Sequence, residues 1–226
     1  GYLVSGANGA VLEDGKVRMV KTPWSDEDIP FEQAAEIGTQ KVINDHSNVG
    51  ILVTSDGTIR SDIERYNYVE AEERCVSELK ALNKPFVVVL NSAYPESEEC
   101  VALKNSLQVK YEVPVIALNA TTLKKDQIVE IFEELLNEFP VTSVDAKLPE
   151  FLERLPMDNR FVSEAIEAVK EAGRNIKKVG DYKDVKLFET SENFMLSTVG
   201  EVKMNEGIIV FDVVPNKDLF YKVISE

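Results

Sequence analysis

The chain has 226 residues, of which 44% are hydrophobic, and its formal net charge is −15. This hydrophobic content suits a globular chain with a core and excludes disorder of the whole. The negative charge argues against nucleic acid as the main partner and against direct contact with anionic lipid, because both require a basic surface. No apolar run approaches the ~20 residues of a membrane span and no signal peptide is visible, so we expect a cytoplasmic location.

The region before Ile29 is polar and irregular, and it contains several glycines and the only tryptophan, Trp24. A long loop beside an α/β sheet is often functional, but a disordered connector explains the same composition. Pro30 suits the first turn of a helix that we expect to run to about Asp45, with Asp28 as a possible cap just outside it.

Three apolar runs then follow, each leading into an amphipathic helical pattern. The runs cover residues 49–53, 85–90 and 113–118, and the stretches after them carry apolar residues three and four positions apart. Continuous apolar strands that alternate with such helices predict a parallel sheet with helices on its faces. We therefore predict three βα units that end near Pro140.

After Pro140 the pattern changes to shorter elements. The predicted elements are an extended stretch over 141–148, a helix over 161–176, strands over 185–190, 194–199 and 208–213, a turn at 205–207 and a short helix from Asn216. Sequential strands flanked by helices predict a small antiparallel α+β domain, separate from the parallel sheet. We place the boundary near residues 140–150.

The loops after the three apolar runs are where a ligand is expected, because an open parallel sheet binds ligands beyond the carboxyl ends of its strands. These loops, 54–58, 91–93 and 119–122, are rich in small polar side chains. Such residues also end strands simply because they form turns, so both interpretations stay open. The chain contains neither GxxxxGK(S/T) nor GxGxxG, and therefore no recognisable phosphate-gripping loop.

The titratable residues suggest no catalytic or metal site. His46 has polar neighbours, but adjacent residues do not converge into a triad, and a role at a helix C-terminus is more plausible. Cys75 and Cys100 are expected to be buried thiols rather than a disulfide or a zinc site. The carboxylate pairs are expected on solvated helical faces, as solubility features: Glu72-Glu73, Glu98-Glu99 and Glu133-Glu134.

Four continuous stretches of the sequence resemble the stage IV sporulation protein A family: residues 18–59, 68–92 and 110–123, and EFPV at 138–141. Members of this family are ATPases that build the basement layer of the bacterial spore coat. The resemblance covers nearly the whole chain. It implies that residues 1–140 are the C-terminal part of a P-loop ATPase domain, with a remnant of its parallel sheet, and that residues 141–226 are an α+β middle domain.

The resemblance also suggests nucleotide-contacting residues. Gly1 resembles the family's switch glycine, which directly follows a strand-terminal aspartate, so the phosphate loop and the main Mg²⁺ ligands are expected upstream of this chain. Asn91 resembles the asparagine of an NKxD motif but lacks the following aspartate, which suits ATP rather than GTP. Asn119 and Ala120 resemble the loop beside the base. We therefore expect these four residues to bind the cofactor, and we expect no catalytic residue and no metal ligand within this chain.

The implied function is that of an intact protein that binds and hydrolyses ATP with Mg²⁺ to drive its own polymerisation. It would act in the mother cell, at the outer forespore membrane surface. The implied partners are further copies of itself, a small amphipathic membrane-anchoring peptide and a coat morphogenetic protein, with only indirect membrane association. This chain alone, which also lacks a C-terminal domain, is expected not to hydrolyse ATP. Two alternatives remain, a GTPase-like regulatory switch and a pure scaffold with a vestigial nucleotide fold.

Overall fold

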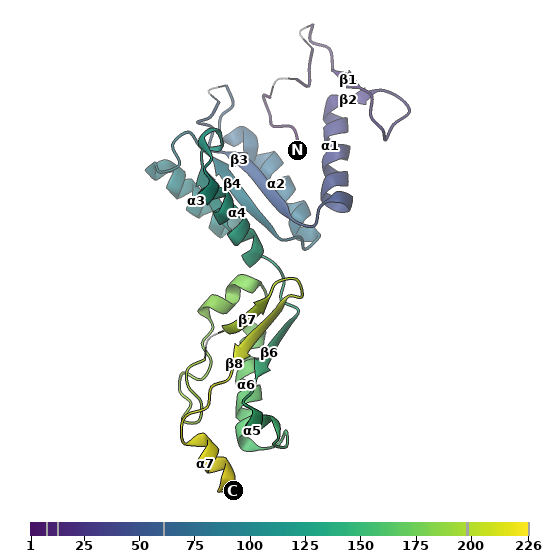
Figure 1. Ribbon diagram of the computed structural model, residues 1–226. Coiled ribbons are helices and arrows are strands. Elements are labelled where there is room, and N and C mark those ends of the chain that lie inside the picture. Colours follow the sequence, from purple (N-terminus) through teal and green to yellow (C-terminus); the bar gives the residue numbers. More distant parts are fainter. Residues whose placement is uncertain (8, 13, 61, 198, 226) are drawn as a thin grey trace. The chain divides into compact units, whose positions relative to one another are not determined.

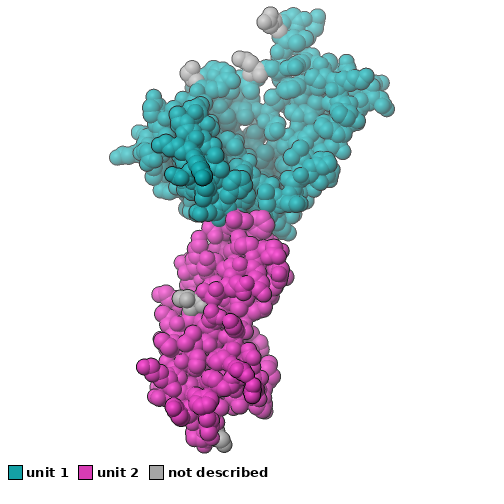
Figure 2. All heavy atoms as spheres, viewed as in Figure 1, with its two compact units in different colours: residues 1–135 teal, residues 136–226 magenta. Residues whose placement is uncertain are grey.

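The computed structural model describes all residues except 8, 13, 61, 198 and 226. The described residues form two compact units, residues 1–135 and residues 136–226 (Figures 1 and 2). Each unit has its own hydrophobic core.

The first unit is built around a parallel sheet of order β3-β4-β5. Its strands are β3 (Gly50–Ser55), β4 (Phe86–Asn91) and β5 (Val115–Leu118). The helices that follow them are α2 (Tyr66–Ala81), α3 (Glu98–Tyr111) and α4 (Lys125–Asn137). The three predicted βα units are thus confirmed, and each strand begins and ends within two residues of its apolar run.

The two faces of this sheet are covered by different helices. Val88 and Leu90 pack with buried residues of α2 and α3, whereas Val87 and Val89 pack with buried residues of α4. This alternation along β4 explains why its sequence is continuously apolar. β3 is less covered, since its Val53 side chain is 59% exposed, and it pairs only with β4 among the described strands.

Upstream of the sheet lies a short hairpin-like pair followed by a helix (Figure 1). β1 (Met19–Val20) pairs antiparallel with β2 (Ile29–Pro30), and α1 (Phe31–Lys41) begins directly after Pro30. No side chain caps α1, so the suggested cap at Asp28 is wrong, and Pro30 itself is the N-cap residue. The expected helical stretch continues to His46 as a π-helical turn over Val42–His46.

The second unit contains a mixed sheet of order β6-β8-β7. β6 (Ser143–Lys147) is parallel to β8 (Ile208–Asp212), and β7 (Val199–Lys203) is antiparallel to it. The purely antiparallel arrangement that we predicted is therefore wrong, because the chain crosses over through α6 (Arg160–Asn175) between β6 and the other strands. Three short helices complete the unit: α5 (Glu150–Glu153), a 3₁₀ helix (Val179–Asp184) and α7 (Leu219–Ile224).

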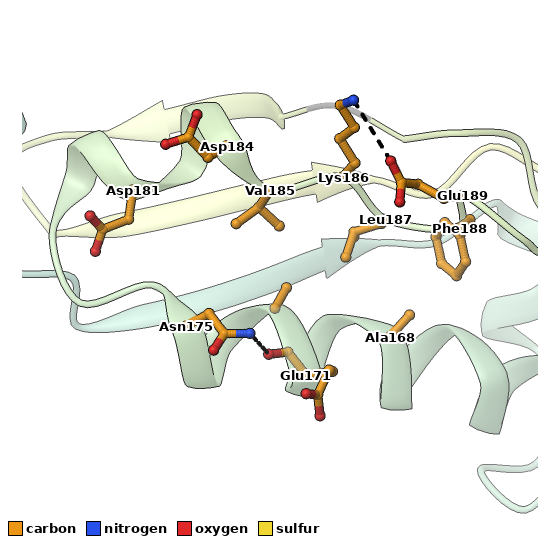
Figure 3. A pocket seen from close by; sticks show the side chains of 11 residues that line it. Ala168, Glu171, Asn175, Asp181, Asp184, Val185, Lys186, Leu187, Phe188 and Glu189 are labelled. Atoms are coloured by element: carbon orange, nitrogen blue, oxygen red, sulfur yellow. Dashed lines mark hydrogen bonds and ion pairs between the residues drawn. The ribbon is translucent and has the colours of Figure 1, made fainter.

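Residues 185–190 form no sheet strand, contrary to prediction. Their pairing is limited to an isolated bridge between Leu187 and Ser197, and Phe188 has a left-handed backbone with φ of 64°. Such a conformation interrupts an extended ladder and is uncommon for a residue with a side chain. As a result, residues 185–189 run alongside α6 with a groove between them (Figure 3).

Candidate functional site

The loops beyond the carboxyl ends of β3, β4 and β5 are joined by hydrogen bonds into one rim. The Asp56 carboxylate accepts from the Thr58 backbone N–H at 2.9 Å and from the Thr58 hydroxyl at 2.6 Å. The Thr58 hydroxyl oxygen in turn accepts from the Ala93 N–H at 2.8 Å, which links the first loop to the second. Ser92, fully buried, accepts from the Tyr94 N–H at 2.9 Å.

The second and third loops are joined through Asn91. Its side-chain Oδ1 accepts from the Ala120 backbone N–H at 2.9 Å. Asn119 Oδ1 accepts from the Thr121 N–H at 2.9 Å and from the Thr121 hydroxyl at 2.6 Å. The side-chain oxygens of Asn91 and Asn119 are thus both engaged as acceptors. Their side-chain NH₂ groups make no hydrogen bond to the described residues, so these two groups remain available as donors.

This rim can bind an uncharged, hydrogen-bonding group better than a charged one. Its loops contain no lysine or arginine, so nothing in them neutralises a phosphate. Two amide donors and several backbone groups beside a hydrophobic sheet are instead suited to the edge of a planar base. The three loops were expected from the sequence, and the structure shows which of their residues contact one another.

Gly1 lies away from these loops, beside α2. The N-terminal amino group is close enough to Cys75 to influence its thiol, and the neighbouring Tyr2 hydroxyl donates to the Glu78 carboxylate. The structure therefore brings together Asn91, Asn119 and Ala120, whereas Gly1 is next to a different part of the unit.

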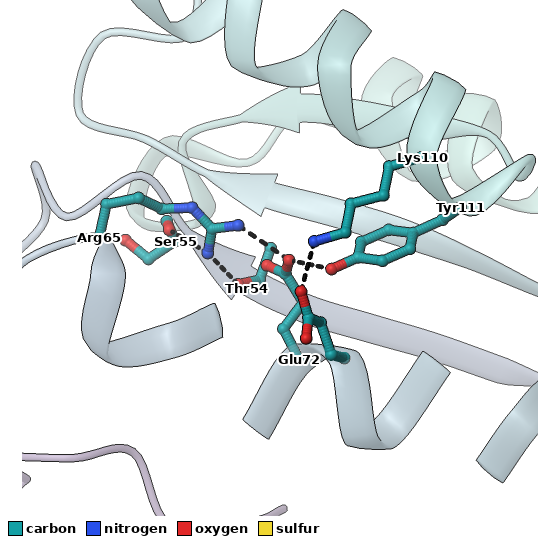
Figure 4. A network of polar contacts seen from close by, with 7 residues as sticks. Thr54, Ser55, Arg65, Glu72, Lys110 and Tyr111 are labelled. Atoms are coloured by element: carbon teal, nitrogen blue, oxygen red, sulfur yellow. Dashed lines mark hydrogen bonds and ion pairs between the residues drawn. The ribbon is translucent and has the colours of Figure 1, made fainter. Parts of the chain in front are cut away.

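A buried ionic network lies directly behind the rim (Figure 4). Arg65 Nη2 donates to Glu72 Oε1 at 2.8 Å, and the Tyr111 hydroxyl donates to the same oxygen at 2.6 Å. Arg65 Nη1 also donates to the Thr54 hydroxyl and the Ser55 carbonyl, at 3.3 and 3.4 Å. Arg65 thus ties the end of β3 to α2.

Glu72 corrects one of our expectations. We predicted that the Glu72-Glu73 pair would be solvated, but the Glu72 side chain is only 1% exposed. The signal was in the sequence, because Val69, Glu72, Val76 and Leu79 recur at three- and four-residue spacing and share one helical face. Glu73, on the neighbouring face, is exposed and pairs with Lys110.

The two acids of this network have opposite pKa shifts. Burial by itself would raise the pKa of Glu72, but the hydrogen bonds from Arg65 and Tyr111 outweigh it, so this pKa is lowered. The pKa of Tyr111 is raised by burial and by the adjacent Glu72 carboxylate. Glu72 is therefore an anion and Tyr111 a neutral donor. Glu72 Oε2 is buried with no hydrogen-bond partner among the described residues.

The remaining candidates, two cysteines and one histidine, lie outside the three loops of the rim. Cys75 and Cys100 are buried free thiols, as predicted, and burial raises the pKa of both. His46 ends the π-helical turn, at the C-terminal position that we expected. Over the described part of the chain, no group of three or more His, Cys, Asp or Glu residues is placed to hold a metal ion. No helix of that part is long and apolar enough to cross a bilayer.

Two family models together match the whole chain. Residues 1–140 match the ATPase domain of Stage IV sporulation protein A, and residues 141–226 match its middle domain. The chain belongs to the stage IV sporulation protein A family. Within the family, it is 43% identical over 227 residues to Stage IV sporulation protein A of Clostridioides difficile (strain 630), and 38% identical over 228 residues to that of Bacillus subtilis (strain 168).

A third member of the family, from Bacillus anthracis, is 37% identical over 227 residues. Each of these alignments covers 100% of this chain but only 46% of the relative. The chain thus spans about half the length of the curated relatives it matches. No solved structure matches the chain.

Proposed function

We propose that the protein in full is an ATP-hydrolysing structural protein that assembles into the basement layer of the bacterial spore coat on the forespore surface. The observation that carries the ATP part is the hydrogen bond between Asn91 and Ala120, which holds two strand-terminal loops together and occupies the Asn91 amide oxygen, so that the amide NH₂ group is the part left to bind a ligand. Family membership supports a role in sporulation and an ATPase domain.

The rim fits the base end of ATP and not its phosphates. A base edge is bound by amide and backbone groups, which the rim supplies, whereas phosphates and Mg²⁺ require a glycine-rich loop, a lysine and oxygen ligands. We infer that those groups belong to the part of the family protein outside this chain. When bound, ATP would supply the cleavable phosphoanhydride, and Asn91, Asn119 and Ala120 would orient its base.

The partners follow from the same proposal. The protein would bind further copies of itself, a small amphipathic membrane-anchoring peptide and a coat morphogenetic protein. An anchoring partner suits a chain of net charge −15, because anionic lipid repels such a surface. The site of action would be the mother-cell side of the outer forespore membrane.

Steady-state kinetics of the full-length protein test the role of Asn91. Replacing Asn91 by alanine removes the link to Ala120 and one amide donor, so we expect the KM for ATP to rise about tenfold, the effect of losing roughly 1.4 kcal/mol of binding. Asn105→Ala is the matched control, because Asn105 is an exposed asparagine on α3. Equal KM values for the two variants would reject a base-binding rim.

Nucleotide choice and assembly separate the alternatives. We expect the full-length protein to hydrolyse ATP in preference to GTP and to form filaments only with ATP, while this chain alone gives no turnover. Preference for GTP would favour a regulatory GTPase, and filaments that form equally without nucleotide would favour a pure scaffold. Turnover by this chain alone would refute the view that the phosphate machinery lies elsewhere.

A further inference from the structure

The second unit contains a groove of about 670 Å³ between α6 and residues 185–189 (Figure 3). One wall is α6. The other wall is residues 185–189, which follow the 3₁₀ helix and form no strand of the sheet. The lining residues are Ala168, Glu171, Ala172, Asn175, Asp181, Asp184, Val185, Lys186, Leu187, Phe188 and Glu189.

The groove has an apolar interior and an acidic border. Its interior is lined by alanine, valine and leucine side chains and by Phe188, while its border has four carboxylates and the single ammonium of Lys186. Lys186 is already paired with Glu189 at 3.7 Å. Glu171 is paired with Arg174 at 2.7 Å, whereas Asp181 and Asp184 have no ion pair among the described residues, so these two carboxylates give the border an excess of negative charge. Such a groove is complementary to a segment that is both apolar and basic.

The wall formed by residues 185–189 can also offer backbone hydrogen bonds. The backbone N–H and C=O of Lys186 have no hydrogen-bond partner among the described residues. Leu187, in contrast, accepts from the Ser197 N–H at 3.0 Å on the opposite side. A segment laid in the groove can therefore exchange backbone hydrogen bonds with this wall at Lys186.

The chain itself contains a segment of the complementary kind. Residues 16–21 read Lys-Val-Arg-Met-Val-Lys, with three basic residues and no acidic one in a chain of net charge −15. We call this the basic segment. Its Val17 and Met19 side chains are 56% and 50% exposed, which is unusual for apolar residues of a stretch that includes β1.

The alternation within the basic segment suits the groove. In an extended chain Val17 and Met19 lie on one face, and Lys16 and Arg18 lie on the other. The side-chain contacts of the two cations are at the surface: Lys16 pairs with Asp14 at 3.1 Å, and Arg18 stacks 5.0 Å from the centre of the Phe31 ring and donates to the Gly9 carbonyl at 3.5 Å. The backbone of both residues is hydrogen-bonded within the first unit, so docking uses their side chains. Exposed contacts of this kind are weak and easily exchanged for others.

We propose that the basic segment of one copy docks in the groove of a second copy. Val17 and Met19 enter the apolar interior, and the cations meet the acidic border. Because the two surfaces differ and lie on different units, the contact is head-to-tail, and repetition of such a contact builds an open chain rather than a closed dimer. This inference rests on the proposed self-assembly and names the surfaces through which it occurs.

Charge exchange tests the contact. The segment variant carries Lys16→Glu, Arg18→Glu and Lys21→Glu, and its size distribution is measured by sedimentation velocity over a concentration series at low salt. We expect concentration-dependent association of the unsubstituted chain, at least tenfold weaker association of the segment variant, and weakening of the native association as salt is added. An unsubstituted chain that stays monomeric up to millimolar concentration would overturn the proposal.

The groove variant provides the complementary half of the test. It carries Glu171→Lys, Asp184→Lys and Glu189→Lys, and it keeps Asp181, whose carboxylate accepts from the N–H groups of Lys177 and Lys178. Alone, this variant should associate as poorly as the segment variant. An equimolar mixture of the two should recover association, because the acidic segment then meets the basic groove. A mixture that stays dissociated contradicts direct contact between these surfaces.

A charge-matched control guards against a general effect of net charge. Reversal of Lys124, Lys125 and Lys217 changes the net charge as much as the segment variant does, at exposed positions outside both surfaces. It should leave association unchanged, and all variants should keep the unsubstituted unfolding temperature. If the control weakens association equally, the effect is one of overall charge and the proposal fails.

Filament assays on the full-length protein separate a failure of the proposed contact from a failure of the proposed function. If full-length protein carrying the segment substitutions still forms filaments with ATP, the proposed function stands and the head-to-tail contact is wrong. If the unsubstituted full-length protein forms none, the proposed self-assembly fails irrespective of the sedimentation result.

Discussion

Arg65 and Glu72 show how one buried ion pair can determine the position of a loop. Glu72 is on α2, Arg65 precedes that helix, and the pair is bound to the end of β3 through Thr54 and Ser55. Removing one partner of a buried pair leaves the other charge without compensation, which costs more than the intact pair contributes. The loop between β3 and α2 is thereby held against the sheet beside the candidate base-binding rim.

We expect Arg65→Met to lower the free energy of unfolding by about 3 kcal/mol, because it leaves the buried Glu72 carboxylate without its ion-pair partner. Urea denaturation followed by circular dichroism measures the loss. The double variant Arg65→Met/Glu72→Leu should recover most of it, since no charge is then buried. Arg60→Met serves as the control, because the Arg60–Asp62 pair is exposed on both sides. A double variant no more stable than the single one would show that the cost has another origin.

The same pair predicts an acid sensitivity. The pKa of Glu72 is lowered in the folded chain, so its stabilisation is complete above the ordinary glutamate value of 4.5 and is lost as pH falls through the lowered native pKa. Between pH 5 and pH 2, stability should fall more steeply in the unsubstituted chain than in the Arg65→Met/Glu72→Leu variant. Parallel pH profiles from chemical denaturation would contradict this assignment.

At the level of elements, the starts of α3 and α6 are each capped by a single side chain. Ser97 caps α3 by accepting from the Cys100 N–H at 3.2 Å, and Asn159 caps α6 by accepting from the Phe161 N–H at 3.0 Å. α1 starts without any side-chain cap. Caps of this kind satisfy backbone donors that a helix leaves unpaired at its first turn.

Ser97→Ala should therefore destabilise the chain by about 1 kcal/mol. The readout is the urea midpoint, with an unchanged denaturant slope showing that the folded and unfolded states keep their compactness. Ser97→Asp is the rescue variant, because a carboxylate accepts the same N–H and is favourable at a helix N-terminus. Failure of aspartate to restore stability would argue against a capping role.

Elements were predicted from sequence with uneven success, for physical reasons. The three βα units are evident from the sequence. β4, for example, is buried on both faces, and its uninterrupted run of apolar residues indicates this burial. Residues 185–190 have an equally good strand pattern, yet the left-handed backbone at Phe188 limits their pairing to the single bridge between Leu187 and Ser197. Nothing in the local sequence signals that conformation, because a left-handed backbone is uncommon for any residue that has a side chain.

The candidate rim was similarly predictable only in outline. Strand order indicates that three loops meet at one edge, but the bond between Asn91 and the Ala120 N–H depends on loop geometry that no spacing specifies. Glu72 was missed because adjacent glutamates suggest a solvated face. Helical periodicity places one of the two inside, and periodicity is the stronger signal.

At the scale of the whole molecule, the chain has two units with separate cores. Phe211 is fully buried in the second unit, within a cluster whose members all come from residues 136–226. The single tryptophan, Trp24, is in the first unit, where its ring packs against Gly38. Trp24 fluorescence therefore reports on unfolding of the first unit, whereas circular dichroism reports on the secondary structure of both units.

Phe211→Ala should destabilise the second unit by about 3–5 kcal/mol, because it removes a large buried side chain and leaves a cavity. We expect circular dichroism to show an early transition that the unsubstituted chain lacks, while the denaturation midpoint reported by Trp24 fluorescence stays in place. A coincident shift of both probes would mean that the units unfold as one cooperative body.

β3 is the end strand of its sheet, and this position divides its backbone amides into two sets. Backbone amides that face β4 alternate with amides that face the open side, where no described strand pairs with them. In deuterated buffer, the two sets would exchange their protons on different timescales, although they belong to neighbouring residues of one strand. Only a further strand laid along that open side would slow both sets alike.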